Sequence, residues 1–289
     1  MLLAVLLVGT AYPETVLHSE HSLYRDITVV ESFGKRCMRF TRQNNAQQSC
    51  IYLNDPNTLV FNCNKLMMGA LYLKPAPRSV LVIGLGGGSL PSALLRVLPK
   101  TDIDIVEIDP AVVMVAKKYF GFRLTPRVHI TEEDGRVFVK RAIRKGEKYD
   151  MIMLDAFENE YIPPHMLTRQ FLAEVKKILT PDGVLAANTF ITSPLYNNES
   201  VTYESVYGSF YNLKKHFDNS RVILVKNDGL LSPEMLKKNA KILEERFLTL
   251  GIESPWLLSL FSTDQDWSTD ARILTDQFSS LYMPNLSSD

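Results

Sequence analysis

The 289-residue chain lacks an excess of charge of either sign, and it has no repeats or low-complexity tracts. It carries 32 Lys+Arg against 32 Asp+Glu, so we expect no nucleic-acid partner, because such binders neutralise many phosphates with basic side chains. Hydrophobic residues make up 46%, which argues against a disordered chain. The composition is typical of a folded globular protein with one large domain, or a small domain and a large one.

Cysteines are few and show no pairing pattern. The chain has Cys37, Cys50 and Cys63, an odd number without a C-x-x-C spacing, which indicates neither a disulfide framework nor a zinc site. We therefore expect three reduced cysteines that act as small apolar side chains, and no bound metal. This cysteine usage favours a cytoplasmic protein.

Long apolar runs are also missing, and the longest candidate is residues 1–11. It falls well short of the roughly 20 residues that span a bilayer. Gly9 and Ala11 resemble a signal-peptide cleavage region, but no basic residue precedes the run. A first β-strand or the remnant of a membrane anchor are the other interpretations, so export or membrane association remains the alternative localisation. We treat 1–21 as a separate N-terminal segment.

A small β-rich module is predicted over 22–74, and a larger domain over 75–289. The module has short β-branched and aromatic runs separated by turn residues. In the larger domain, short apolar strands alternate with helices, which indicates a parallel sheet covered on both faces. Strands are expected at 27–30, 37–40, 48–53, 80–83, 103–108, 128–130, 151–154, 184–187 and 221–225, and helices at 59–73, 110–120, 136–145, 168–179, 203–216 and after Ser232.

A glycine-rich turn follows the first strand of the larger domain and reads GLGGGS over 84–89. Glycine permits a sharp turn and lets a ligand approach the backbone without meeting a Cβ atom. We expect the turn to bind part of a nucleoside ligand, although Ser89 at the third fingerprint position makes a dinucleotide less suitable. The alternative is a tight turn without a ligand. The glycines concerned are Gly84, Gly86, Gly87 and Gly88.

Acidic residues end the next two strands. Glu107 is placed to accept hydrogen bonds from ribose hydroxyls, and Asp134, followed by Gly135, from an exocyclic adenine amine. Because parallel strands bring their carboxyl ends to one edge, these groups and the glycine turn should meet there. A solvated strand end for Glu107 and a helix cap for Asp134 are the simpler alternatives.

Asp155 ends the fourth strand at the same edge and is our candidate catalytic acid–base group. Glu158 and Glu160 follow it, before two prolines and His165, and we interpret this segment as a lid that carries negative charge into the crevice. Alternatively, Asp155 orders its own loop and the two glutamates are solvated. His165 could act as an auxiliary base, although a lone histidine after two prolines is more often structural. Trp256 and Trp267 are read as packing residues.

Four motifs in this order resemble the spermidine synthase (polyamine aminopropyltransferase) family, and most of all its bacterial spermidine-synthase-like branch. They are VLVIGLGGGSLP at 80–91, VEIDP at 106–110, DGR at 134–136 and YDMIMLDAF at 149–157, with a weaker match in ILTD at 273–276. The resemblance covers about residues 22–190. It implies a class I methyltransferase-like (Rossmann-like) parallel sheet behind a small N-terminal β module, and a homo-oligomer, a dimer being the expectation.

The resemblance also implies a donor and ligands for it. The donor would be decarboxylated S-adenosylmethionine, or S-adenosylmethionine itself. Glu107 matches the family's ribose ligand, and Asp134 with Gly135 its adenine contacts. Gln48 matches its N-terminal donor-site glutamine, and Asp155 its catalytic acid.

The half of the site that would hold the amine departs from the family. Gly87 stands where the family has an aspartate that faces the aminopropyl group, and Glu158 replaces the second acid of the segment that begins at Asp155. A gapless count places Asn62 and Met68 where the family has a tyrosine and a histidine. The adenosine half is therefore better matched than the amine half.

Three functions follow from these observations. The first is aminopropyl transfer to a small cationic amine such as putrescine, with Asp155 as the base and Glu158 binding the amine. The second is methyl transfer from S-adenosylmethionine, because Gly87 leaves no charge to repel the donor's carboxylate. The third is a nucleoside-binding module without catalysis. The acidic crevice makes a cationic acceptor the leading expectation.

Overall fold

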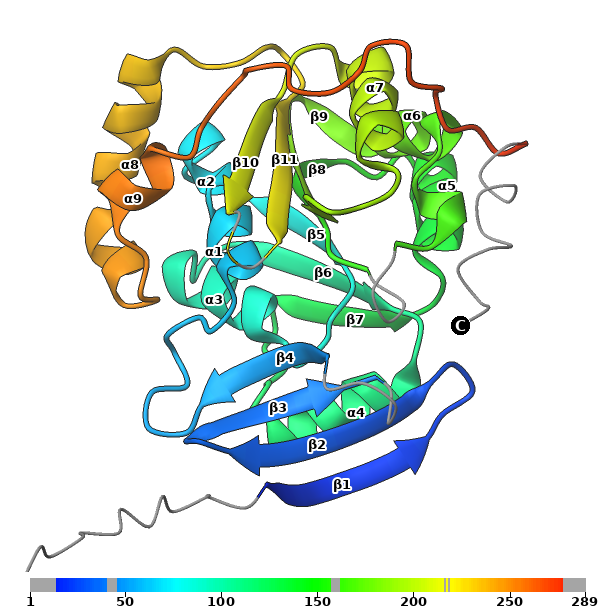
Figure 1. The fold of residues 1–289 in the computed structure, drawn as a ribbon. Helices are drawn as coiled ribbons and strands as arrows, with labels where there is room; N and C mark the ends of the chain where they lie inside the picture. Colours follow the sequence, from blue (N-terminus) through cyan, green and yellow to red (C-terminus); the bar gives the residue numbers. More distant parts are fainter. Residues whose placement is uncertain (1–13, 41–45, 157–161, 216, 218, 278–289) are drawn as a thin grey trace, which may run out of the picture.

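The computed structural model describes residues 14–40, 46–156, 162–215, 217 and 219–277, and it contains two β-sheets (Figure 1). The smaller is antiparallel, with strands in the order β1-β2-β3-β4. Phe33 and Gly34 form its tight β2–β3 turn, and both have positive φ. Because β1 pairs with β2, the sheet begins inside the segment 1–21 that we treated as separate. The strands are β1 (Thr15–His21), β2 (Asp26–Ser32), β3 (Lys35–Arg39) and β4 (Gln47–Tyr52).

Two of the cysteines pair, so our expectation of three reduced thiols is wrong. Cys37 of β3 and Cys50 of β4 are register partners on adjacent strands, and their sulfurs form a disulfide. The pair is almost fully buried beside Val30, Val60 and Phe61. The thirteen-residue spacing gave no recognisable motif, because the contact depends on strand register rather than on a local pattern. Cys63 is not part of this disulfide, and its thiol donates to Asn64 Oδ1 at 3.9 Å.

The larger sheet has seven strands in the order β10-β11-β9-β8-β5-β6-β7. The five neighbouring strands β9, β8, β5, β6 and β7 run parallel, whereas β11 runs antiparallel to its neighbours β9 and β10. This arrangement confirms the predicted Rossmann-like, mostly parallel sheet. Alternate side chains of β5 enter opposite cores, as expected for a strand buried on both faces. The strands are β5 (Ser79–Ile83), β6 (Asp102–Glu107), β7 (Val128–Glu132), β8 (Tyr149–Leu154), β9 (Leu179–Phe190), β10 (Tyr211–Lys215) and β11 (Ser220–Lys226).

Helices cover both faces of this sheet (Figure 1). One layer contributes to the core that includes Val80 and Val82, and the other to the core that includes Leu81 and Ile83. The first layer is α1 (Asn62–Met68), α2 (Ala70–Leu73), α3 (Ser89–Val97), α8 (Pro233–Leu248) and α9 (Ser254–Leu258); the second is α5 (Gly135–Lys145), α6 (Arg169–Ile178) and α7 (Tyr196–Tyr207).

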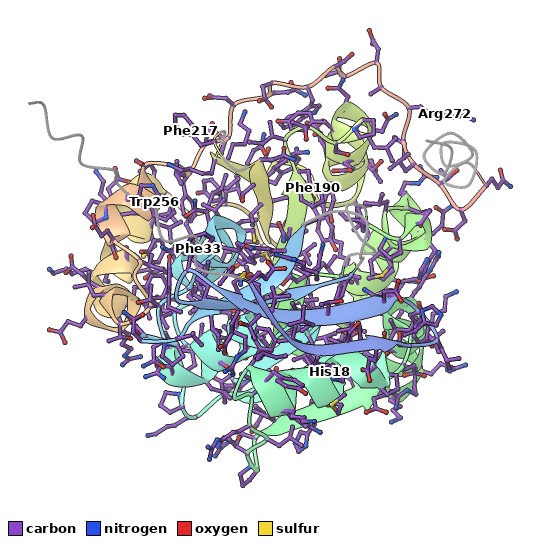
Figure 2. The ribbon with its side chains drawn as sticks, turned by 60° about the horizontal axis from the view of Figure 1, so that its bottom comes forward. His18, Phe33, Phe190, Phe217, Trp256 and Arg272 are labelled. Carbon is purple, nitrogen blue, oxygen red and sulfur yellow. A yellow bond between two sulfur atoms is a disulfide. The ribbon has the colours of Figure 1, made fainter. Side chains whose placement is uncertain are left out.

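Helix α4 (Pro110–Tyr119) joins the two sheets. Val113 and Ala116 face the main core, whereas Val112 and Val115 pack with the smaller sheet. Figure 2 brings the smaller sheet forward and shows it lying across α4, and His18 of β1 stacks on Tyr119 with ring centroids 5.2 Å apart. This packing fixes β4 beside the glycine turn.

Two predicted helices differ from the structure. The helix expected over 59–73 is divided at Gly69 into α1 and α2. The helix expected over 203–216 is wrong in its second half, because α7 ends before Gly208 and β10 follows. Trp267 packs on Phe210, as expected for a packing residue. In the described part of the chain, no helix has the length and apolar character needed to cross a membrane.

Candidate active site

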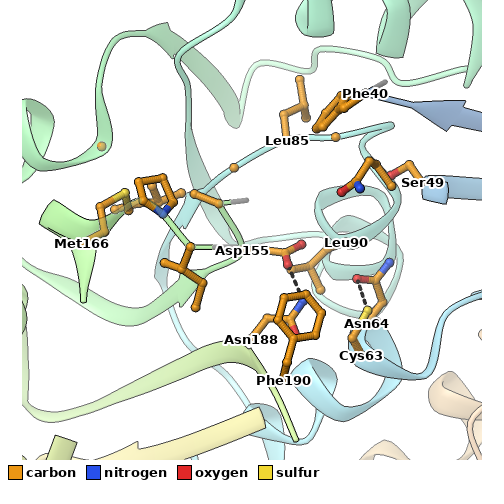
Figure 3. Close-up of a pocket in the computed structure, with 18 of the residues that line it drawn as sticks. Phe40, Ser49, Cys63, Asn64, Leu85, Leu90, Asp155, Met166, Asn188 and Phe190 are labelled. Atoms are coloured by element: carbon orange, nitrogen blue, oxygen red, sulfur yellow. Dashed lines mark hydrogen bonds between the residues drawn. The ribbon is translucent and has the colours of Figure 1, made fainter. Parts of the chain in front are cut away.

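A cavity of about 930 Å³ lies at the carboxyl edge of the large sheet, within the usual size range of ligand pockets. The loops after β5, β6, β7 and β8 line it, together with β4 and the ends of β9 and α7. In the close-up, the Asp155 side chain points between Leu90 and Asn188, and Met166 lies on the opposite side from Ser49 (Figure 3). The predicted meeting of strand ends at one edge is therefore present.

The glycine turn requires glycine for two different reasons. Gly84 has φ +103°, and a Cβ there would lie 2.2 Å from the carbonyl oxygen of Asp155. Gly86 has φ +53°, and a Cβ there would lie 2.8 Å from the hydroxyl of Ser49. The first glycine thus lets the ends of β5 and β8 approach each other, and the second admits β4. Both line the cavity.

Ser49 connects the smaller sheet to the glycine turn. Its hydroxyl accepts the backbone N–H of Gly87 at 2.8 Å, and the contact is buried. A Cβ at Gly87 would meet the Phe120 ring at 2.9 Å, and one at Gly88 would meet Phe122. Gly87 and Gly88 line a small neighbouring hollow and not the large cavity. A side chain at position 87 would therefore require Phe120 or Ser49 to shift.

Glu107 ends β6 with both carboxylate oxygens held by backbone groups. Oε2 accepts the N–H of Leu85 at 3.0 Å, and Oε1 accepts that of Asp109 at 3.1 Å. Burial raises its pKa, against the lowering effect of these two hydrogen bonds. The carboxylate faces the cavity and retains lone pairs that could accept from vicinal hydroxyls.

Asp134 combines two roles that the sequence left as alternatives. Oδ1 caps α5 by accepting from the N–H groups of Arg136 and Val137, each at 2.9 Å. Oδ2 lies 2.9 Å from Nε2 of His165, and this hydrogen bond lowers the pKa of Asp134. Gly135 follows, where a Cβ would collide with Ile83. Of the residues in this group, Ile83, Asp134, Gly135 and His165 line the cavity, whereas Arg136 and Val137 do not.

Residues near the end of the described region connect α5 and α6 by hydrogen bonds, next to Asp134. Asp276, in the weakly matched ILTD segment, accepts two hydrogen bonds from the Arg136 guanidinium, both at 2.8 Å. It also accepts from Thr168 at 2.7 Å, and Arg136 pairs in addition with Glu174. The network ties α5 and α6 together next to Asp134.

Asp155 follows β8, and its backbone N–H donates to the carbonyl of Ile83 at 2.8 Å. The Nδ2 group of Asn188, on β9, donates to Asp155 Oδ1 at 2.8 Å. Burial raises the pKa of Asp155 to about 6, although the Asn188 hydrogen bond acts in the opposite direction. A carboxylate with such a pKa is mostly ionised near neutral pH, yet it can hold a proton transiently.

Other residues singled out in the sequence are placed as follows. Gln48 and Asn62 line the cavity, whereas Met68 is buried in the main core. Glu158 and Glu160 lie outside the described residues. His165 is bound to Asp134. Asp109 caps α4, as predicted.

Some lining residues were missed, and their signals differ. Asn188 follows a predicted parallel strand, so the rule that selected Asp155 would have found it. Ser49, Arg25 and Glu199 reach the cavity from β4, from the loop before β2 and from α7. Only tertiary packing brings these three to the site, and no local pattern marks them.

The cavity is strongly acidic. Arg25 and His165 are the basic members of its described lining. The carboxylates of that lining are Glu107, Glu133, Asp134, Asp155 and Glu199. An acid-rich cavity attracts a cation and disfavours an additional carboxylate.

Fold and site together define a protein of the methyltransferase-like nucleoside-binding class. The chain belongs to the spermine/spermidine synthase domain family, whose model matches residues 63–222. It is 44% identical over 269 residues to a polyamine aminopropyltransferase of Vibrio vulnificus, covering 92% of this chain and 90% of the relative.

Two solved structures share the fold. A probable spermidine synthase from Corynebacterium glutamicum has a TM-score of 0.66 and 17% identity, covering 89% of this chain and 98% of the other. Human methyltransferase-like protein 13, in complex with SAH, has a TM-score of 0.59 and 28% identity, covering 72% and 95%.

Proposed function

We propose that the protein transfers an aminopropyl group from decarboxylated S-adenosylmethionine to a small cationic amine, such as a diamine of the putrescine type. The observation that carries this proposal is the Asp155 carboxylate, held by Asn188 in an acidic cavity beside a nucleoside-type glycine turn. The name of the Vibrio relative, polyamine aminopropyltransferase, supports the same reaction.

The donor fits the described residues at one end of the cavity. Glu107 would accept from the ribose hydroxyls, and Asp134 and Gly135 would border the adenine. Gly84 and Gly86 leave space for the backbone to approach the ligand, while Gln48 and Ser49 border it from β4. Accepting an adenine amine at Asp134 requires Oδ2 to be shared with His165, because Oδ1 already caps the helix.

Chemically, the protein has to align two reactants and remove one proton. An aliphatic amine is mostly protonated at neutral pH, since the reference pKa of a Lys amine is about 10.4. Asp155 accepts a proton from the acceptor's ammonium, which frees the nitrogen lone pair. The nitrogen then attacks the aminopropyl carbon on the sulfonium, the C–S bond breaks, and its electrons return to sulfur to give neutral methylthioadenosine. The proton passes from Asp155 to water, and alignment supplies much of the acceleration.

Methyl transfer from S-adenosylmethionine is the second candidate function. Gly87 and the likeness to the human methyltransferase favour it, because no acid at position 87 repels the donor's carboxylate. Five lining carboxylates oppose it, since the methionine carboxylate would enter a site that already carries negative charge. The decarboxylated donor has no such group, so the electrostatics favour aminopropyl transfer.

Identification of the nucleoside product distinguishes these functions. The purified chain is incubated with each donor in turn and with a pool of aliphatic amines. Aminopropyl transfer releases methylthioadenosine from the decarboxylated donor, whereas methyl transfer releases S-adenosylhomocysteine from the other. Binding of a donor without either product would favour a non-catalytic nucleoside-binding module and overturn the proposal. A homodimer and a cytoplasmic location stay predictions, which light scattering and cell fractionation test.

A further inference from the structure

The last described stretch of the chain approaches the α5 end of the cavity without lining it. It runs past α7 and α6 towards α5 (Figure 1). The Leu274 carbonyl accepts the N–H of Arg169 at 2.8 Å, and the N–H of Leu274 donates to Thr202 at 2.9 Å. Asp276 then accepts at 2.7 Å from Thr168, the N-cap of α6. These contacts place the Asp276 carboxylate at the beginning of α6.

Arg136 connects Asp276 to two residues of the cavity wall. Its guanidinium donates to both carboxylate oxygens of Asp276, each at 2.8 Å, and Nη1 also donates to the His165 carbonyl at 3.1 Å. The His165 ring lies 2.9 Å from Asp134 Oδ2, and Asp134 Oδ1 accepts the backbone N–H of Arg136 at 2.9 Å. Asp134, Arg136 and His165 thus form a closed ring of hydrogen bonds. Asp276 and Glu174 hold the guanidinium in this ring.

The ring leaves the Asp134 carboxylate little rotational freedom. Oδ1 accepts from two helix N–H groups, and one side of Oδ2 is occupied by His165. A carboxylate oxygen has two lone pairs, so an adenine amine finds one acceptor position on Oδ2, and the ring fixes its direction. Hydrogen bonds weaken steeply when their angle departs from linearity. A shift of His165 would therefore weaken the contact between Asp134 and the amine.

We propose that Asp276 is a positioning residue for nucleobase recognition, which acts through Arg136 and His165 to aim Asp134 Oδ2 at the exocyclic amine of adenine. The inference rests on the proposed aminopropyl transfer, whose donor supplies the adenosine ligand. Asp276 does not line the cavity, so its effect on the ligand is indirect. The 273–276 segment thereby contributes to the choice of an amino-substituted purine over a purine without the amine.

The test compares the affinity of methylthioadenosine, the nucleoside product, with that of its analogue bearing hydrogen in place of the exocyclic amine. Calorimetry measures both in wild type and in Asp276→Asn. Wild type should prefer the amino form by about tenfold or more, the scale of one hydrogen bond to a charged group. In Asp276→Asn this preference should fall to about threefold or less, through weaker binding of the amino form, with binding of the analogue unchanged.

Two features of the test separate positioning from a general loss of structure. The preference is a ratio of two affinities in one protein, so a partly unfolded variant binds both nucleosides less and keeps the same ratio. Asp270 is exposed on the same stretch and does not line the cavity, so Asp270→Asn should behave as wild type.

A double substitution tests the route through Arg136. Arg136→Lys keeps the positive charge but loses the planar fork that reaches Asp276 and His165 together, so it should lower the same preference. If Asp276 acts through Arg136, adding Asp276→Asn to Arg136→Lys should lower the preference no further.

An unchanged preference in Asp276→Asn, or losses that add in the double variant, would overturn the positioning role of Asp276 while the proposed function stands. Equal affinity of wild type for the two nucleosides would overturn it as well, because there would be no amine contact to position. If wild type binds neither nucleoside and forms no methylthioadenosine from the decarboxylated donor, the proposed function itself fails.

Discussion

The Asn188 amide donates from Nδ2 to Asp155 Oδ1 at 2.8 Å, between the ends of neighbouring parallel strands β9 and β8. This orientation leaves Asn188 Oδ1 buried without a partner among the described residues. Asn188 therefore supports the ionised form of Asp155 with one atom and presents an acceptor with the other. An amine that enters between them can donate to both groups.

Removing the Asn188 amide should move the acid limb of the pH–rate profile upward. The wild-type rate should fall as the pH drops through about 6, because burial raises the pKa of Asp155 to that value and the base must be ionised. A hydrogen bond to a charged group contributes about 1.5–3 kcal/mol, so Asn188→Leu should shift the limb by about one pH unit or more. The control is Asn198→Leu. The amide of Asn198 donates to the Arg272 carbonyl, and Asn198 does not line the cavity. An unshifted limb in Asn188→Leu would show that the Asn188 hydrogen bond does not set the ionisation that limits the rate.

Two substitutions of Asp134 should separate its cap from its charge. Asp134→Ala removes the acceptor for two backbone N–H groups of α5 and should cost about 0.5–2 kcal/mol of unfolding free energy. Asp134→Asn retains an oxygen for the cap but loses the charged partner of His165. Donor affinity, measured by calorimetry, should fall in both variants. Equal stability losses in the two variants would contradict the separation.

The cost of Asp134→Asn should also depend on pH. The His165 hydrogen bond lowers the pKa of Asp134 below its ordinary value of 3.8, so the ionised form stabilises the fold above that value. This contribution is lost as the pH falls through the lowered pKa. Chemical denaturation should therefore show wild type more stable than Asp134→Asn at pH 7 and the difference shrinking below pH 4. A difference that is constant down to pH 2 would show that the ionised form of Asp134 does not stabilise the fold.

Two glycines with almost the same φ offer a matched comparison. Gly84 and Gly229 have φ of +103° and +105°, but only at Gly84 would a Cβ meet another residue, the backbone of Asp155. Alanine at Gly229 should cost only backbone strain, about 1–2 kcal/mol, and leave kcat unchanged. Gly84→Ala should in addition displace Asp155 and lower kcat about 100-fold, since a shift of 1 Å at a reacting group can cost that much. Equal kcat in the two variants would show that the close β5–β8 approach is not needed.

Much of this site was predictable because its parts follow one rule. Glu107, Asp134 and Asp155 each end a parallel strand, so strand order alone predicts that they share an edge. Glu199, by contrast, reaches the cavity from α7, which contacts β11 through Arg221, Tyr196 and Ser200, and the predicted helix over 203–216 missed that helix's true start. The partner of Cys37 depended on the register of β3 against β4, which no spacing reveals.

The disulfide can be tested by counting thiols. Denatured, non-reduced protein should react with one equivalent of a thiol reagent, at Cys63, whereas three equivalents would contradict the Cys37–Cys50 bond. Replacing both paired cysteines by serine should lower the unfolding free energy by about 3 kcal/mol, the scale for closing a loop of this length. Because β4 carries Ser49 as well as Cys50, the same variant should bind the donor more weakly.

The rate of methylthioadenosine formation by wild type and Asp155→Asn, at saturating decarboxylated S-adenosylmethionine and 1,4-diaminobutane, tests the central claim most directly. We predict that wild type releases methylthioadenosine and the aminopropylated amine in equal amounts, and that Asp155→Asn, with unchanged thermal stability and donor affinity, is slower by about 10²–10⁴-fold. Equal rates in the two proteins, or S-adenosylhomocysteine formed from the carboxylated donor in place of methylthioadenosine, would contradict it.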